Sequence, residues 1–125
     1  MKRPRPRGPA RSQGRYGMAV VHGRSMAPAL REGDRLLVSY AARPVVGDAV
    51  VARFADGTIA VKRAVERRTT RSGRPGWWLL SDNLDDGVDS RHRGPVSEDD
   101  VLGVVLLRLW PSPRLVRVGR PESCR

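Results

Sequence analysis

Two residues of this sequence stand out for the chemistry that their side chains could perform, Ser25 and Lys62. Ser25 follows the apolar residues 18–21 and precedes Pro28 and the pair Gly33-Asp34, so we expect it on a loop between two strands. A serine hydroxyl is a weak nucleophile until a neighbouring base takes its proton. Taken alone, Ser25 is more typical of a turn serine that hydrogen-bonds its own backbone.

Lys62 is unusual because all but two of the 24 basic residues are arginine, the other lysine being Lys2. It lies in the apolar segment 59–65, where strand alternation places Ala60, Lys62 and Ala64 on one face and Ile59, Val61, Arg63 and Val65 on the other. Arginine stays protonated in proteins, whereas burial can lower the pKa of a lysine by about 3 to 5 units. A neutral Lys62 could therefore take the proton of Ser25. Considered alone, Lys62 is more typical of a strand lysine whose amine reaches solvent.

Three motifs occur together in an order that resembles the type I signal peptidases. They are Ser25-Met26 with Pro28 and Gly33-Asp34, then Val61-Lys62-Arg63, then Ser81-Asp82-Asn83 with Asp89-Ser90-Arg91. Members of that family are serine endopeptidases with a Ser-Lys dyad on a β-rich fold. The resemblance implies that Ser25 is the nucleophile, that Lys62 is the general base and that the Ser25 amide contributes to an oxyanion hole. It also implies supporting roles for Met26, Asp82, Asn83, Asp89 and Arg91.

The sequence departs from the family pattern at three positions near these motifs. Ser81 stands where signal peptidases usually have glycine, and Gly87 stands where many have a serine that helps to orient the lysine. Gly23 occupies a position where some members place a second oxyanion-hole hydroxyl. We therefore expect another group to orient Lys62, and an oxyanion hole that is weaker or completed by backbone.

Two further sequence blocks, and the lack of a segment before the serine motif long enough to be a transmembrane anchor, point to a narrower group of related proteases. The sequence 61–66, Val-Lys-Arg-Ala-Val-Glu, and the pair Trp77-Trp78 are similar to the nickel-type superoxide dismutase maturation proteases. That resemblance implies a protease that removes an N-terminal extension from the dismutase precursor. The nickel would then belong to the substrate.

The pattern of apolar residues predicts a mainly β protein. We expect strands at 17–22, 35–40, 49–54, 58–66, 77–80 and 101–109, with a tight hairpin at Asp56-Gly57. We expect a surface connection at 67–76, a long irregular loop at 81–96 and a short helical turn at 97–100. The fold class is a small single-domain, signal-peptidase-like arrangement with a barrel-like or twisted sheet and that long loop.

Length and composition fix the remaining expectations. The 125 residues suit one catalytic domain at 17–111, between a disordered basic tail at 1–16 and a basic C-terminal tail at 112–125. No apolar run approaches the length of a membrane-spanning helix, so we expect a soluble, cytoplasmic protein. Cys124 is the only cysteine and the histidines are His22 and His92, so we expect no intramolecular disulfide, no metal site and no cofactor.

Other functions compete with the protease interpretation. A signal peptidase acting on exported proteins and a self-cleaving repressor-type domain share the chemistry, although no helix-turn-helix region precedes the serine motif. A non-catalytic basic β-domain would bind nucleic acid or anionic surfaces, which the net charge of +11 favours. We expect no nucleic acid, because the tryptophans lie in apolar runs typical of a core, but the basic N-terminal tail could contact a membrane. His22 is close to Ser25 in sequence, yet no third group completes a triad.

Overall fold

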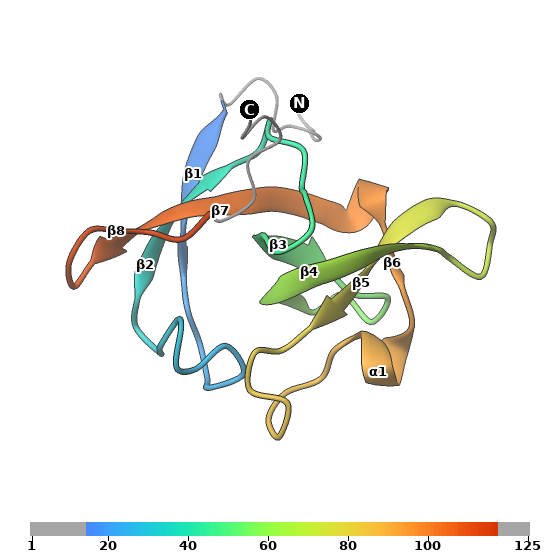
Figure 1. The fold of residues 1–125 in the computed structure, drawn as a ribbon, viewed down its shortest axis with the longest axis horizontal. Coiled ribbons are helices and arrows are strands. Elements are labelled where there is room, and N and C mark those ends of the chain that lie inside the picture. The colour runs from blue at the N-terminus through green and yellow to red at the C-terminus, as the bar shows by residue number, and fades with distance from the viewer. Residues whose placement is uncertain (1–14, 118–125) are drawn as a thin grey trace, which may run out of the picture.

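The structure, a computed structural model, describes residues 15–117, and these form a mainly β domain (Figure 1). Two short helices accompany the strands, α1 (Ser90–Arg93) and the 3-10 helix η2 (Glu98–Asp100). The strands are β1 (Tyr16–Val20), β2 (Arg35–Ser39), β3 (Ala49–Arg53), β4 (Ile59–Thr69), β5 (Pro75–Leu80), β6 (Val96–Ser97), β7 (Val101–Trp110) and β8 (Arg114–Leu115).

All eight strands belong to one open, antiparallel sheet. Its order is β1-β2-β7-β3-β4-β5-β6, with β8 paired to β7. The ladder from β3 to β4 runs from Arg53↔Ile59 to Ala49↔Arg63, as the hairpin expected at Asp56-Gly57 requires. The sheet is strongly twisted, so that β1 and β2 run steeply across the direction of β7 in Figure 1. The expected fold class is therefore confirmed.

Two clusters of buried side chains lie on opposite faces of this sheet. Consecutive residues of β3, Ala49 and Val50, belong to different clusters, as alternation along a strand requires. The first cluster consists of Val21, Met26, Leu30, Leu36, Val38, Ala49, Val105 and Val116. The second consists of Val50, Ala52, Phe54, Ala64, Trp77, Leu79, Val96 and Val104.

The strand that carries Lys62 follows the expected alternation. Val61 packs against the first cluster, whereas Ala60 and Ala64 pack in the second. Lys62 is 3% exposed and lies on the same face as the two alanines, so its amine does not reach solvent as an ordinary strand lysine does.

Two segments are more regular than the sequence indicated. Strand β4 continues to Thr69 and β5 begins at Pro75, so only 70–74 turn within the connection that we expected at 67–76. The polar residues there stay in the sheet because Arg67 and Arg68 stack over the rings of Trp77 and Trp78, at 5.0 and 4.0 Å from the ring centroids. The loop expected at 81–96 also contains α1, which Asp89 caps.

One prediction about the aromatic residues was wrong. Trp77 is buried, but Trp110 is 53% exposed at the end of β7, where the guanidinium of Arg35 lies 5.4 Å from its ring centroid. The apolar run that contains Trp110 reaches the edge of the core before it ends, so the last residues of β7 project into solvent.

Strands are present slightly outside the range 17–111. Strand β1 begins at Tyr16, and β8 adds Arg114–Leu115 beyond the expected boundary. Val116 is buried in the first cluster, and the guanidinium of Arg117 lies 3.3 Å from the carboxylate of the buried Asp48. The rest of the two basic tails, residues 1–14 and 118–125, lies outside the described residues.

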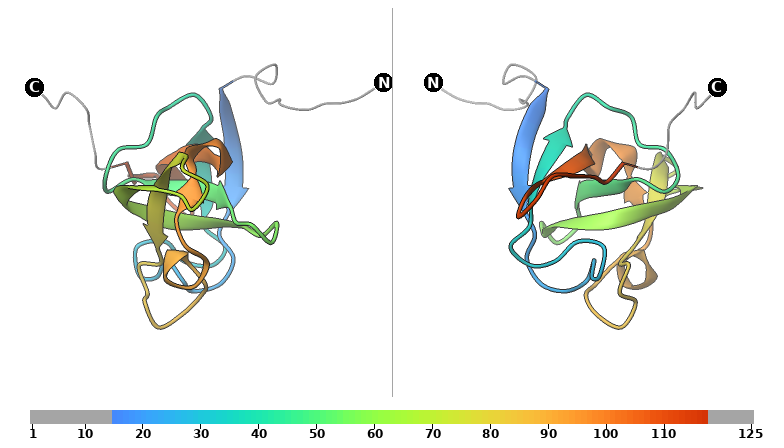
Figure 2. Two further views of the ribbon diagram at one scale, coloured as in Figure 1. Left: turned by 90° about the vertical axis from the view of Figure 1, so that its right-hand side faces the viewer. Right: turned by 60° about the vertical axis from the view of Figure 1, so that its left-hand side comes forward.

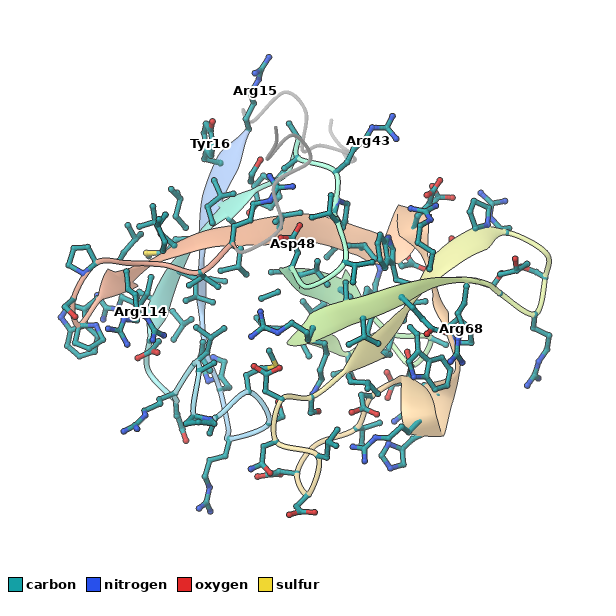
Figure 3. The ribbon with its side chains drawn as sticks, viewed as in Figure 1. Arg15, Tyr16, Arg43, Asp48, Arg68 and Arg114 are labelled. Carbon is teal, nitrogen blue, oxygen red and sulfur yellow. The ribbon has the colours of Figure 1, made fainter. Side chains whose placement is uncertain are left out.

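The loops that carry the sequence motifs meet at one end of the sheet. Both views of Figure 2 place the segment between β1 and β2 beside the segment that follows β5. Figure 3 shows Arg15 and Arg43 projecting at the opposite end of the molecule, while Asp48 lies in its interior. The sheet thus brings residues near 25 and near 81–91 together.

Candidate active site

Ser25 lies on a loop that is fixed at both ends. At its base, the Val21 amide donates to the Asp34 carbonyl and the Gly33 amide donates to the Val21 carbonyl, at 2.9 and 2.8 Å. Next to the serine, Met26 is 2% exposed and Leu30 is fully buried in the first cluster. The loop is therefore anchored by apolar side chains on either side of its turn, and the direction of the Ser25 hydroxyl is set by the core.

The amine of Lys62 connects this loop to the sheet. Its Nζ lies 3.0 Å from Ser25 Oγ and donates a second hydrogen bond of 3.0 Å to Ser81 Oγ. The three groups come from three separate parts of the chain, namely the loop after β1, the middle of β4 and the end of β5. A serine hydroxyl in contact with a buried amine is the arrangement that nucleophilic catalysis needs.

The surroundings of Lys62 favour the neutral form of its amine. Burial lowers the pKa of Lys62 below its ordinary value, and the negative charges of Asp89 and Asp86 oppose that shift only in part. Because a neutral amine has a free lone pair, it can accept the proton of Ser25, which an ammonium group cannot do.

Ser81 is the site residue that sequence reasoning missed. It is 2% exposed, and its hydroxyl is the second partner of the Lys62 amine. A signal was present, because Ser81 replaces a glycine of the family pattern while Gly87 replaces a serine. The sequence could not show that Ser81 reaches the amine, since that depends on how the end of β5 packs against β4.

Gly87 leaves room for this arrangement. A Cβ atom at Gly87 would lie 2.6 Å from Ser25 Cβ and 3.1 Å from Lys62 Nζ. Its φ of 81° is also a conformation that side-chain-bearing residues rarely adopt. In this backbone conformation, position 87 cannot carry the serine that the family often has there. The Ser81 hydroxyl, which lies 3.3 Å from where that Cβ would be, contacts the amine instead.

Asp89 holds Ser81 in place. The carboxylate is fully buried, accepts a 2.8 Å hydrogen bond from the Ser81 amide and is bound by two guanidinium hydrogen bonds of Arg91, at 2.9 and 3.0 Å. Although burial by itself would raise the pKa of Asp89, the hydrogen bonds from Arg91 and Ser81 lower it well below its usual range. Asp89 and Arg91 thus contact each other, and Asp89 binds the backbone of Ser81, whose hydroxyl contacts Lys62.

The remaining predicted residues bind the two loops to each other. The backbone N–H of Asn83 donates a 2.8 Å hydrogen bond to the Ser25 carbonyl, and the backbone N–H of Asp82 donates a 3.4 Å hydrogen bond to Met26 Sδ. Asp82 also forms a bidentate ion pair with Arg63 of β4, with N–O distances of 2.6 and 3.1 Å. All seven predicted residues therefore lie together, and Arg63 joins them as a support that the sequence analysis did not identify.

A cleft opens beside the serine on both faces of β4. On one face, a cavity of about 130 Å³ is lined by Ser25 and by apolar side chains that include Val21, Val51 and Val61. On the other face, a cavity of about 330 Å³ is lined by Ser25, Lys62 and residues of the β3–β4 hairpin. His22 is exposed and lines both cavities. The hydrogen-bond partner of the Ser25 hydroxyl is Lys62 and not this histidine.

The first residues of β4, which pair with a strand on one edge only, lie between these cavities. Residues 59–62 pair with β3, but β5 joins β4 only from Arg63 onward. Over residues 15–117, the other edge of this stretch has no partner strand. Its backbone groups therefore remain free to bind an extended peptide next to the serine.

Two structural features bear on cofactors and membranes. Within residues 15–117, no group of three or more His, Cys, Asp and Glu side chains is arranged to hold a metal ion. In the same part of the chain, no helix has the length and apolar character needed to cross a bilayer.

Comparison with known proteins agrees with the class of site that this geometry defines. Residues 4–105 match the Peptidase S24-like family, so the chain belongs to that family and is a serine peptidase by class. A relative is the mitochondrial inner membrane protease subunit 1 of Xenopus tropicalis, which is 30% identical over 115 aligned positions. The match covers 75% of this chain and 69% of that protein.

Proposed function

We propose that this protein is a serine endopeptidase with a Ser25–Lys62 dyad that removes an N-terminal extension from a precursor protein. The observation that carries the proposal is the 3.0 Å contact between Ser25 Oγ and the amine of a lysine that is 3% exposed. The lowered pKa of Lys62 supports it, because the base must be neutral before it can act.

In the proposed reaction, Lys62 Nζ takes the hydroxyl proton while Ser25 Oγ attacks the carbonyl carbon of the scissile peptide bond. The resulting oxyanion is bound by backbone N–H groups that include that of Ser25, as the family resemblance implies. The Lys62 ammonium then gives its proton to the leaving amine, and an acyl ester forms on Ser25. Water, deprotonated by Lys62, hydrolyses that ester and restores the serine.

The two cavities and the free edge of β4 support an extended substrate. A peptide that pairs with residues 59–62 adds a strand to the sheet and places its side chains alternately on the two faces. The cavity of about 130 Å³ is much smaller than the roughly 300 Å³ at which ligand pockets begin, so we expect a small apolar side chain there.

For the substrate, we propose the precursor of a nickel-type superoxide dismutase, in the cytoplasm. The support is the resemblance of residues 61–66 and of Trp77-Trp78 to the maturation proteases of that enzyme. The nickel ion would bind to the processed dismutase and would take no part in the cleavage.

The test is to incubate the purified protein with the dismutase precursor and to read the new N-terminus by mass spectrometry. We expect one cut that is lost in Ser25→Ala and in Lys62→Arg but kept in Lys2→Arg, the same substitution at the only other lysine. A folded wild-type protein that cuts an exported precursor but not the dismutase would refute the substrate and leave the dyad intact. Full activity of Lys62→Arg would refute the dyad.

A further inference from the structure

The larger cavity beside the dyad is lined by apolar side chains and by one ion pair, which we call its charged rim. Phe54, Ile59, Ala60 and Val88 contribute apolar surface, and Phe54 is 5% exposed. Asp56 and Arg93 also line the cavity and form an ion pair, with an N–O distance of 2.8 Å. The pair joins the β3–β4 hairpin to α1, so it connects two elements that are far apart in the sequence.

The geometry points to a second specificity site. We propose that the larger cavity selects a large, uncharged substrate side chain, and that the Asp56–Arg93 pair enforces this choice. The selected residue is the neighbour of the one whose side chain enters the smaller cavity. The inference rests on the endopeptidase function proposed above, and it adds a determinant of the substrate class.

The alternation of β4 places the two cavities on opposite sides of a bound peptide. Val51 and Val61 line the smaller cavity alone and pack with the first core cluster, whereas Phe54 lines the larger cavity alone and packs in the second. Ile59 and Ala60 lie between the two cavities and line both. Both cavities contact Ser25. Consecutive side chains of a peptide strand on the free edge of residues 59–62 therefore enter different cavities.

The size of the second cavity favours a large side chain. Its volume of about 330 Å³ is well above the 130 Å³ of the first. Phe54, Ile59 and Val88 give the stem of such a side chain an apolar surface to cover. An alanine at this position would leave that surface in contact with water.

The ion pair disfavours a charged side chain of either sign. A substrate cation in the cavity would meet the guanidinium of Arg93, and a substrate anion would meet the carboxylate of Asp56. Asp56 is held by Arg93 and also accepts a 3.0 Å hydrogen bond from the Thr58 amide, so neither member of the pair is free to serve a new partner. Removing one member therefore creates a preference for the charge of the member that was removed.

The experiment measures cleavage of a peptide mixture randomised at consecutive positions, by the wild type, Arg93→Gln and Asp56→Asn. Asparagine keeps the acceptor that holds the Thr58 amide, so the hairpin turn is preserved. At one position, adjacent to the one restricted to small residues, we expect the wild type to favour large uncharged residues. There, Arg93→Gln should raise the kcat/KM ratio of lysine over glutamate by about three- to fivefold, and Asp56→Asn should lower it similarly, as suits a partly exposed pair. Arg74→Ala breaks the ion pair that joins Arg74 of the β4–β5 hairpin to Asp99 of η2, and neither residue lines the two cavities, so it should change no preference.

The same substitutions are also made in a Ser25→Ala background, where retention of peptides on the immobilised protein replaces cleavage as the readout. Cleavage with unchanged preferences in both rim variants overturns the second site and leaves the peptidase function standing. A charge switch in retention, with no cleavage by the wild type, supports the second site and refutes the proposed function. If neither retention nor cleavage responds to the rim variants, the inference is overturned.

Discussion

The substitution Ser81→Ala tests whether the Ser81 hydroxyl orients the amine of Lys62 toward Ser25. The amine donates one hydrogen bond to Ser81 Oγ while it faces Ser25 Oγ, both at 3.0 Å. Alanine removes the Ser81 oxygen and leaves a buried N–H without that partner. The amine is then free to turn its lone pair away from Ser25, so proton transfer becomes slower while the nucleophile itself is unchanged.

The size of the effect follows from one buried hydrogen bond. Leaving a buried polar group unpaired costs about 1 to 3 kcal/mol, which corresponds to a fall in kcat of roughly 5- to 150-fold. Ser81 lines neither of the two cavities that flank Ser25, so KM should stay within about twofold of the wild type because uniform substrate binding is unaffected. The assay is steady-state cleavage of a peptide substrate, with the pH dependence of kcat recorded for each variant.

Ser90 offers a matched control. It is 1% exposed, and its hydroxyl accepts a 2.9 Å hydrogen bond from the Leu79 amide, whereas the Lys62 amine has Ser25 and Ser81 as its hydrogen-bond partners. Ser90→Ala should therefore lower the melting temperature about as much as Ser81→Ala while kcat stays near the wild-type value. Equal losses of kcat in the two variants, or a Ser81→Ala enzyme with unchanged kcat, would refute the positioning role of Ser81.

Three further predictions concern the same site. Gly87→Ala should reduce kcat at least about tenfold, because its Cβ would lie 2.6 Å from Ser25 Cβ at a strained φ of 81°, and kinetics together with a thermal melt will check this. Asp89→Asn should lower the free energy of unfolding by about 1 to 3 kcal/mol in denaturant titrations, because it weakens the buried hydrogen bonds of this carboxylate while the Arg91 side chain, which is 34% exposed, still reaches water. The lowered pKa of Asp89 stabilises the fold fully above its ordinary pKa of 3.8 and progressively less as the pH falls below it, so acid should destabilise the wild type more than Asp89→Asn. Burial lowers the pKa of Lys62, so kcat/KM should rise with pH and level off below the ordinary lysine value of 10.5, whereas a flat profile would exclude a lysine base.

The sequence was most informative where one strand or one turn decides the outcome. Alternation alone placed Lys62 with Ala60 and Ala64, and the Asp56-Gly57 hairpin followed from turn chemistry. The resemblance supplied the pairing of Ser25 with Lys62, which are 37 residues apart and meet only through the sheet.

What the sequence could not provide depends on distances between elements. That Ser81 reaches Lys62, and that Gly87 lies against Ser25, follows from how the end of β5 and the loop after it pack on β4. Arg93 and Asp56 meet for the same reason, because α1 folds back to the β3–β4 hairpin. The extension of β4 to Thr69 was missed since stacking of arginine on tryptophan keeps polar residues in a sheet, which a pattern of apolar residues does not reveal.

The central claim is that Lys62 acts as the base for Ser25, and its most direct test is a digest in which the natural substrate need not be identified. A proteome-derived peptide mixture is treated with the wild type, Ser25→Ala and Lys62→Met, and the new N-termini are counted by mass spectrometry. Methionine preserves most of the volume of Lys62 and needs no charge in the buried site, so the variant should fold. We predict that the wild type generates a defined set of N-termini and that both variants lose them by about 10³-fold or more. Retention of the same N-termini at comparable rates by folded Lys62→Met would contradict the claim.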